Sequence, residues 1–207
     1  MNLSSKYKFA FLCMPKCAST SIERAIAKYS DITFKGDSGQ KHMRAHQFRT
    51  EVDGFIETFC IMRDPIDWLG SWYRYRSRPA LEGTPNYTGT MTFDHFIEGY
   101  LSRNKPPYAT FIDKQSDFFT MPSHTCGVDV IFDMKRLDLV EKYLSTKIGT
   151  DIVLPYTNSS PKKEQKDLVI SGSVRAKLNK KIEKDVLIYN TIAATGVATA
   201  HQINELL

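Results

Sequence analysis

Three short apolar runs, separated by amphipathic segments, dominate the pattern of the chain. The runs Phe9–Met14, Phe59–Met62 and Val128–Phe132 have the length and the aromatic or β-branched content of buried strands. Around residues 22–29, 93–101, 137–148 and 178–189, apolar residues return instead at helical spacing. Because these strands alternate with helices, the pattern predicts an α/β fold with a central parallel sheet flanked by helices.

Length and composition describe one globular domain. The 207 residues are 42% apolar and 25% charged, which excludes a disordered chain. We therefore predict a single domain over residues 1–207, with a peripheral tail after about residue 192. The net charge of +5, from 28 basic and 23 acidic residues, is a mild bias toward anionic ligands and too small to indicate nucleic acid.

The cysteines and the apolar runs predict a cytoplasmic protein that neither binds metal nor enters a membrane. Cys13, Cys17, Cys60 and Cys126 fit no zinc-binding spacing. Cys13 and Cys60 lie inside apolar runs, where reduced, buried thiols are expected. The first apolar run is shorter than a signal-peptide core, and no segment approaches the ~20 apolar residues of a membrane span.

The first strand is followed by a turn of small residues. Pro15 ends the strand, and Lys16 precedes five small residues, Cys17, Ala18, Ser19, Thr20 and Ser21. Thr20 and Glu23 have the spacing of a capping box, which predicts a helix beginning near Thr20. A strand, a turn with a lysine and a helix N-terminus together predict a phosphate cradle, because free backbone N–H groups and the helix dipole face the anion.

This turn has two other interpretations. Lys16 could be an ordinary solvated lysine, since every α/β protein has strand–helix turns. A Walker A loop is disfavoured, because the lysine precedes the hydroxyls and no glycine lies between Pro15 and Ser21. An ordinary ATP or GTP hydrolase is therefore not expected.

The second strand opens a similar segment with different chemistry. Arg63 ends the strand, Asp64 can cap a helix, and Pro65 suits the first helical position. Ser71 lies two turns further along that helix. The Arg63 guanidinium and the Ser71 hydroxyl could converge on one anion.

Aromatic and basic residues alternate along the same helix. For Trp68, Trp72 and Tyr73 we expect at least two to pack in the core. Arg74, Arg76 and Arg78 are expected on a solvated face. The rival interpretation is a non-enzymatic surface that binds nucleic acid or a polyanionic glycan.

Together the two segments resemble the paired signatures of the sulfotransferases that use 3′-phosphoadenosine 5′-phosphosulfate (PAPS), closest to the carbohydrate-type branch. Met14-Pro-Lys-Cys-Ala-Ser-Thr-Ser-Ile22 resembles the family's 5′-phosphosulfate loop, and Ile61-Met-Arg-Asp-Pro65 with Ser71 resembles its 3′-phosphate segment. A looser likeness continues through residues 115–119, 128–144 and 154–160. One departure is that Ala18 and Ser19 stand where family loops often carry a glycine.

The resemblance implies a P-loop-like nucleotide-binding core and transfer of a sulfuryl group from PAPS to an acceptor hydroxyl. Adenosine 3′,5′-bisphosphate would be released, and no metal is required. By the same resemblance, Lys16 and the residues Cys17 to Ser21 would hold the phosphosulfate, with Lys16 also catalytic. Arg63 and Ser71 would hold the 3′-phosphate. The segment from Pro155 to Lys163 is rich in turn-forming residues, which fits either a plain surface loop or a lid over the nucleotide, with Asn158, Ser159 and Lys162 touching phosphate.

A general base completes this scheme. Histidine suits the task, because its pKa is near neutral. Related carbohydrate sulfotransferases place a histidine some twenty residues before the arginine, which favours His42, with His46 second. Two alternatives stay open: the histidines could be surface residues of one helix, or a carboxylate could serve as the base.

The acceptor is expected to be a small molecule or a glycan, and neither its identity nor the oligomeric state can be inferred from the sequence. No nucleic-acid partner is expected. The alternative enzyme is a P-loop-like small-molecule kinase, which the absence of the Walker A order disfavours.

Overall fold

The computed structural model describes residues 1–34, 38–155 and 168–207, which form two compact units. Unit 1 comprises the described residues within Met1–Arg63, Gln115–Asn158 and Leu187–Leu207, and unit 2 comprises those within Asp64–Lys114 and Ser159–Val186. The single domain expected over residues 1–207 stays a prediction.

Unit 1 is built on one six-stranded sheet with the order β3-β1-β2-β4-β5-β6. Its central strands, β2 (Phe9–Phe11), β4 (Glu57–Met62) and β5 (Val130–Asp133), are parallel and nearly completely buried. These strands correspond to the three apolar runs, so the predicted central parallel sheet is confirmed.

Three short strands that the pattern did not predict extend this sheet antiparallel to their neighbours. They are β1 (Asn2–Ser4), β3 (Ile32–Thr33) and β6 (Val197–Thr199). Each has two or three residues, which is too short for a periodic signal. Residues after 192 thus contribute the edge strand β6, through pairs such as Ile131 with Ala198.

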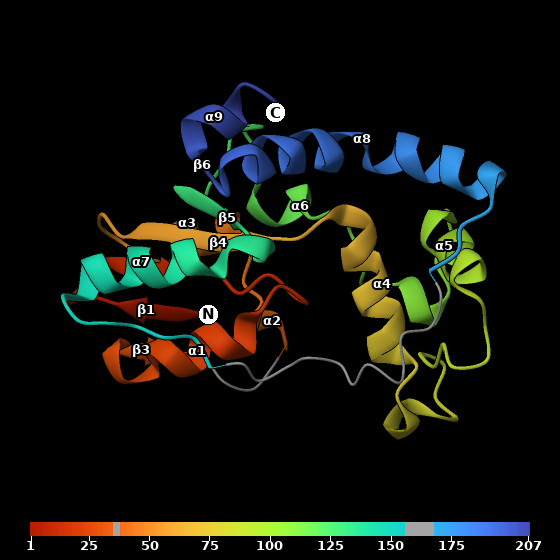
Figure 1. Ribbon diagram of the computed structural model, residues 1–207, viewed down its shortest axis with the longest axis horizontal. Coiled ribbons are helices and arrows are strands. Elements are labelled where there is room, and N and C mark those ends of the chain that lie inside the picture. Colours follow the sequence, from red (N-terminus) through yellow and green to blue (C-terminus); the bar gives the residue numbers. More distant parts are fainter. Residues whose placement is uncertain (35–37, 156–167) are drawn as a thin grey trace. The chain divides into compact units, whose positions relative to one another are not determined.

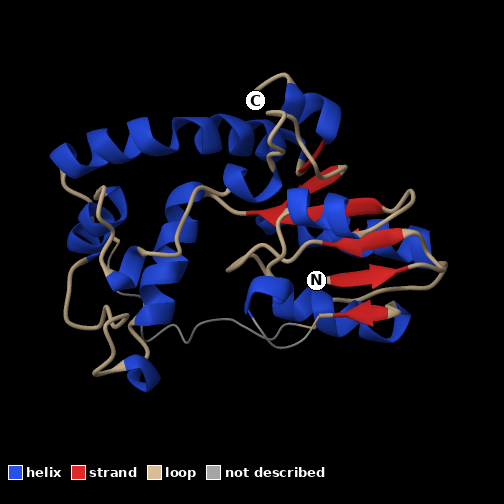
Figure 2. Ribbon diagram, turned by 180° about the vertical axis from the view of Figure 1, so that it is seen from behind, coloured by secondary structure: helices blue, strands red, loops and turns tan. Residues whose placement is uncertain are grey.

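Helices of unit 1 lie on both faces of the sheet. On one face α7 (Leu137–Ile148), in front of the sheet in Figure 1, packs through Tyr143, whose ring centroid lies 5.2 Å from that of Phe59. On the other face, turned to the viewer in Figure 2, lies α3 (Ala45–Glu51). Its Arg49 donates hydrogen bonds to Thr58 Oγ1 and Asp129 Oδ2. Successive strand residues therefore point to opposite helices, as the pleat requires.

Short helices complete unit 1. They are α1 (Ser19–Ile26), η1 (Ala27–Tyr29), α2 (Ser38–Lys41), α6 (Ser116–Phe119), η4 (Met134–Arg136) and α9 (Ala200–Asn204). The long helix α8 (Gly172–Thr195) contributes its first part to unit 2 and its last part to unit 1.

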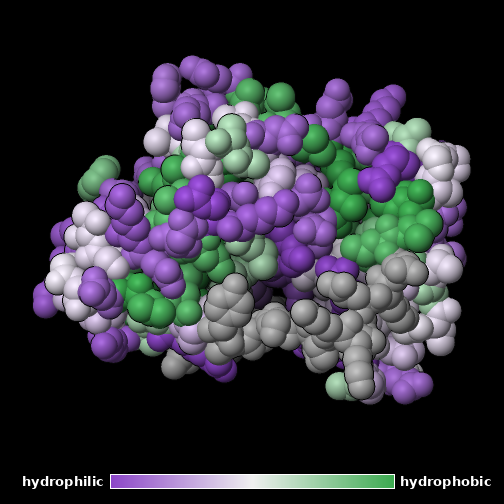
Figure 3. Space-filling view, viewed as in Figure 1, coloured by the Kyte–Doolittle hydropathy of each residue, from purple (hydrophilic) through white to green (hydrophobic). Residues whose placement is uncertain are grey.

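Unit 2 is helical and holds an aromatic core. It contains α4 (Pro65–Arg76), η2 (Pro79–Leu81), α5 (Phe93–Leu101) and η3 (Pro107–Ala109). Tyr73 of α4 packs against Phe93 and Phe96 of α5, with ring centroids 5.4 and 5.6 Å apart. Figure 3 shows hydrophobic side chains gathered over the part of this unit that holds α5, and mainly hydrophilic side chains along α7 of unit 1.

Candidate active site

The loop of residues 14–22 is called the phosphosulfate loop after the family segment that it resembles, and it leads from β2 into α1 without any glycine. It turns by placing Lys16 (φ 66°) and Ala18 (φ 53°) in the left-handed region. An L-residue in that region costs about 1–2 kcal/mol, so the loop is held in a strained conformation. The missing glycine is therefore replaced by two strained residues.

The N-terminus of α1 presents unused donors. Within the described ranges, the amides of Ala18, Ser19 and Thr20 donate no hydrogen bond, whereas Ser21 N donates to Ala18 O at 3.1 Å. No side chain caps the helix, and no acidic residue lies in its first turn. Three N–H groups and the positive end of the helix dipole are thus available to an anion.

The predicted capping box is wrong. The helix begins at Ser19, with Ala18 as its N-cap residue. A capping box needs its Glu at the third helical position, which is Ser21, and Glu23 lies two residues beyond it. The Glu23 carboxylate instead accepts from Cys13 Sγ at 3.3 Å and pairs with Lys41 Nζ at 3.0 Å. This pairing links α1 and α2 to the strand end beside the loop.

Arg63 lies near the phosphosulfate loop. Burial raises the pKa of the Cys17 thiol to about 12, while the positive charges of Arg63 and then Lys16 act in the opposite direction. Both cations therefore lie close enough to Cys17 to lower the pKa of its thiol electrostatically. Cys17 is completely buried, so its thiol cannot contact a ligand. Unit 1 thus brings together Lys16, Cys17 and Arg63.

A buried carboxamide, for which the sequence pattern predicts no role, connects these residues. Gln115, 1% exposed, accepts from Arg63 N at 3.0 Å and donates to Arg63 O at 2.8 Å. Cys17 Sγ donates to the same Gln115 oxygen at 3.8 Å. No periodicity or motif marks an isolated glutamine as such a bridge, so only the folded chain reveals it.

His42 is attached to the strand end that precedes the loop. It lies in the turn after α2, and its Nδ1 is 2.6 Å from Cys13 O. Because a carbonyl oxygen only accepts, Nδ1 carries the proton and Nε2 keeps the lone pair. Burial lowers the pKa of His42, the Cys13 hydrogen bond raises it, and the charge of Lys41 lowers it again. The net direction is downward, which favours the neutral ring.

His46 lies on a different element from His42. It belongs to α3, which begins at Ala45, and it is half-buried. The two histidines are therefore not the i and i+4 residues of one helix, and that alternative is wrong.

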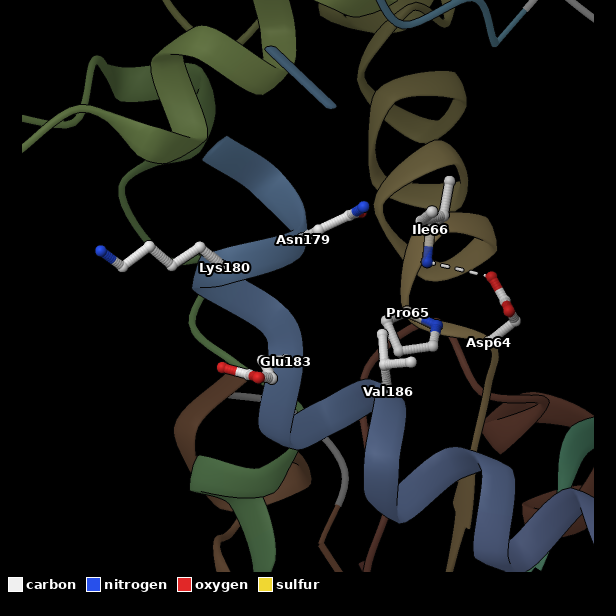
Figure 4. Close-up of a pocket in the computed structure, with 7 residues that line it drawn as sticks. All are labelled: Asp64, Pro65, Ile66, Asn179, Lys180, Glu183 and Val186. Carbon is white, nitrogen blue, oxygen red and sulfur yellow. Dashed lines mark hydrogen bonds between the residues drawn. The ribbon is translucent and has the colours of Figure 1, made fainter. Parts of the chain in front are cut away.

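The start of α4 matches its sequence prediction. Asp64 caps the helix by accepting from Ile66 N at 3.0 Å and Asp67 N at 2.9 Å, and Pro65 takes the first position (Figure 4). Ser71 follows on α4 and is half-buried. Since Ser71 belongs to unit 2 and Arg63 to unit 1, their convergence on one anion stays a prediction.

The aromatic and basic residues of α4 mostly serve the core of unit 2. Trp68 and Tyr73 are 5% and 2% exposed, as expected for core residues. The solvated position expected for Arg76 is wrong: the residue is 6% exposed, with its guanidinium 5.2 Å from the Trp72 ring centroid. It also donates to Pro107 O. A continuous cationic face from Arg74 to Arg78 is therefore absent, which weakens the polyanion-binding interpretation.

Unit 2 also contains a cavity of about 520 Å³ beside the start of α4. Figure 4 shows the side chains around it, which come from α4 and α8: Asp64, Pro65, Ile66, Asn179, Lys180, Glu183 and Val186. Of these, Asp64 is engaged in capping α4, as described above.

Some expectations fall outside what the structure covers. Asn158 and Ser159 lie outside the described residues. Among the residues that are described, no group of three or more histidine, cysteine or acidic side chains could hold a metal ion. In the same part of the chain no helix is long and apolar enough to cross a membrane.

The fold and the loop define an α/β protein whose first strand–turn–helix segment leaves the amides at the helix start without an internal acceptor. The family model described as "Sulfotransferase family" matches residues 1–192, nearly the whole chain. The protein therefore belongs to the sulfotransferase family, whose members transfer sulfuryl groups. Comparison with curated proteins and with solved structures gave no significant match.

Proposed function

We propose that this sulfotransferase moves a sulfuryl group from PAPS to a hydroxyl of a small molecule or glycan and releases adenosine 3′,5′-bisphosphate. One observation carries the proposal: the three unused amides at the start of α1 lie in the same unit as Lys16 and Arg63. The carbohydrate-type branch and a cytoplasmic location belong to the same proposal.

The phosphosulfate end suits the loop. As the bond between sulfur and the bridging phosphate oxygen breaks, negative charge grows on the leaving phosphate. The amides of Ala18, Ser19 and Thr20 and the Lys16 ammonium are donors that would strengthen as this charge develops. Lys16 is therefore proposed to act mainly in the transition state.

The 3′-phosphate needs side chains, because Asp64 already occupies the first amides of α4. Arg63 can offer a two-pronged guanidinium to that phosphate, and we propose that Ser71 adds its hydroxyl. Asn158 and Ser159 complete the proposed contacts. Recognition of the 3′-phosphate would distinguish PAPS from ATP.

His42 is proposed as the base, with Nε2 taking the acceptor proton while the acceptor oxygen forms its bond to sulfur. The Cys13 carbonyl holds Nδ1–H, so the ring presents the nitrogen that can accept. Cys13 precedes Lys16 by three residues, which limits the separation of their Cα atoms to about 11 Å. His46 is the second candidate.

Calorimetry with adenosine 3′,5′-bisphosphate, adenosine 5′-monophosphate and ATP tests the proposal. We expect the bisphosphate to bind most tightly and Arg63→Ala to weaken its binding about 10- to 100-fold. Arg24→Ala, which removes an exposed cation of α1, is the matched control and should change nothing. Equal binding of the three nucleotides, or turnover of ATP, would contradict the proposal and favour the kinase.

A further inference from the structure

Gln115 forms a closed pair of hydrogen bonds with one residue of the main chain. Its Oε1 accepts from Arg63 N at 3.0 Å, and its Nε2 donates to Arg63 O at 2.8 Å. A neighbouring strand would offer the same combination of one acceptor and one donor. The side chain therefore continues the sheet by one residue beyond Met62, where β4 ends.

The position of Gln115 follows from the course of β2. Phe59 O accepts from Leu12 N at 2.9 Å, so the peptide groups of Phe59 face β2. Bonding direction alternates along a strand, and Arg63, four residues later, has the same parity as Phe59. At that level β2 has already turned into the phosphosulfate loop. The Gln115 carboxamide thus occupies the place that β2 leaves.

The same carboxamide oxygen also reaches the loop. Cys17 Sγ donates to Gln115 Oε1 at 3.8 Å, a weak hydrogen bond made by the residue between Lys16 and Ala18. Gln115 therefore contacts both the residue proposed to bind the 3′-phosphate and the loop proposed to bind the phosphosulfate. With 1% exposure, its side chain is too buried to contact a nucleotide itself.

We infer that Gln115 is a positioning residue that sets Arg63 relative to the phosphosulfate loop and thereby determines selectivity for the 3′-phosphate. This inference rests on the proposed function. A guanidinium binds phosphate through a fixed fork, so a shift of its backbone misaligns both prongs. Loss of the carboxamide would also leave the Arg63 N–H and C=O without their partner, which costs free energy in a buried site.

Gln115→Leu tests the inference through the ratio of two dissociation constants, for adenosine 5′-monophosphate and adenosine 3′,5′-bisphosphate. We expect the variant to bind the bisphosphate about 10-fold more weakly and the monophosphate within about 2-fold of wild type. Thr88→Val is the matched control: it removes another buried side-chain hydrogen bond, to Tyr73 O in unit 2. It should lower stability without changing the ratio.

Gln115→Glu gives a second test, also usable if Gln115→Leu fails to fold. A protonated carboxyl can both accept from Arg63 N and donate to Arg63 O, whereas a carboxylate can only accept. Because burial at this position would raise the pKa of the carboxyl above its ordinary value of about 4.3, the ratio relative to wild type at each pH should be preserved at pH about 5 and fall toward pH about 8. A merely structural glutamine would not produce that dependence on pH.

The outcomes separate the inference from the proposed function. If wild type does not prefer the bisphosphate, the proposed function fails and the inference fails with it. If wild type prefers it and Arg63→Ala removes the preference, the proposed function stands. An unchanged ratio in both Gln115 variants would then overturn the inference alone.

Discussion

The two strand–turn–helix segments of this chain begin alike and prepare their helices in opposite ways. In the phosphosulfate loop α1 has no side-chain cap and no acidic residue in its first turn, and Lys16 and Ala18 are strained. In the segment of residues 61–71, α4 is capped by Asp64 and has Asp67 in its first turn. The first helix leaves its initial amides without an internal acceptor, and the second satisfies them with its own carboxylate.

This difference separates two ways of binding an anion. A helix start with free amides binds through the backbone and must be held open at a cost in stability. A helix start that carries its own carboxylate repels an anion, so a nearby phosphate must be held by side chains such as Arg63. Backbone donors suit a reacting group whose charge changes, and side chains suit a group that is only recognised.

Lys16→Ala should produce the largest effect on the first segment. If Lys16 acts on the developing charge, turnover should fall about 100- to 1,000-fold while adenosine 3′,5′-bisphosphate binding changes less than 10-fold. Steady-state kinetics with PAPS and calorimetry measure the two quantities. Lys28→Ala, which removes an exposed lysine beyond α1, should leave both unchanged. A loss of binding without a loss of turnover would mean that Lys16 only recognises the nucleotide and does not act in the transition state.

His42 gives the next largest effect, through pH. Since its pKa is lowered, mainly by burial, the proton leaves His42 at a pH below the 6.5 of an ordinary histidine. Activity should therefore be full at pH 7 and fall only on acidification through that lower pKa. His42→Gln should remove this acidic limb and slow turnover by about 100-fold or more. A limb that persists in this variant would point to His46 or a carboxylate.

The same desolvation makes a prediction for stability with a defined sign. A folded-state pKa below the unfolded one means that the unfolded chain binds more protons in the interval between them. The contribution of His42 to stability is therefore complete above pH 6.5 and is lost as pH falls through the folded-state value.

Hydrophobic pattern was sufficient for the centre of the fold. Strands β2, β4 and β5 carry runs of buried apolar residues, and the helices α5 and α7 carry a clear apolar stripe, so each gives a periodic signal. The edge strands β1, β3 and β6 were not predictable, because two or three residues pairing across long sequence separations leave no local pattern.

In the candidate site, too, features set by neighbouring residues could be predicted, and features set by contacts distant in sequence could not. The N-cap role of Asp64 depends only on its neighbours in sequence, so it could be predicted. Glu23 contacts Cys13 and Lys41, 10 and 18 residues away, and its local spacing wrongly predicted a capping box. Gln115 contacts Arg63 and Cys17, 52 and 98 residues away, and local spacing predicted no role for it. The left-handed conformation of Ala18 could not be predicted either, because glycine is the usual sequence signal for such a position and none is present there.

Asp64→Ala would make the second segment resemble the first. Removing the carboxylate frees the amides of Ile66 and Asp67 and should destabilise the protein by about 1 kcal/mol in urea unfolding. Glu82→Ala, an exposed substitution elsewhere in unit 2, should stay within about 0.5 kcal/mol of wild type. An Asp64→Ala variant as stable as wild type would mean that this cap does not set the difference between the two helices.

Ala18→Gly should produce the smallest effect and acts on the strain of the first segment. Glycine removes the penalty of the left-handed conformation, about 1–2 kcal/mol, but adds chain entropy to the unfolded state. The expected net result is a gain of up to about 1 kcal/mol in the free energy of unfolding. Ala25→Gly inside α1 is the same substitution at a right-handed position and should cost about 1 kcal/mol. Opposite signs for the two glycines would identify Ala18 as a strained position, whereas equal losses would mean that the loop carries no strain there.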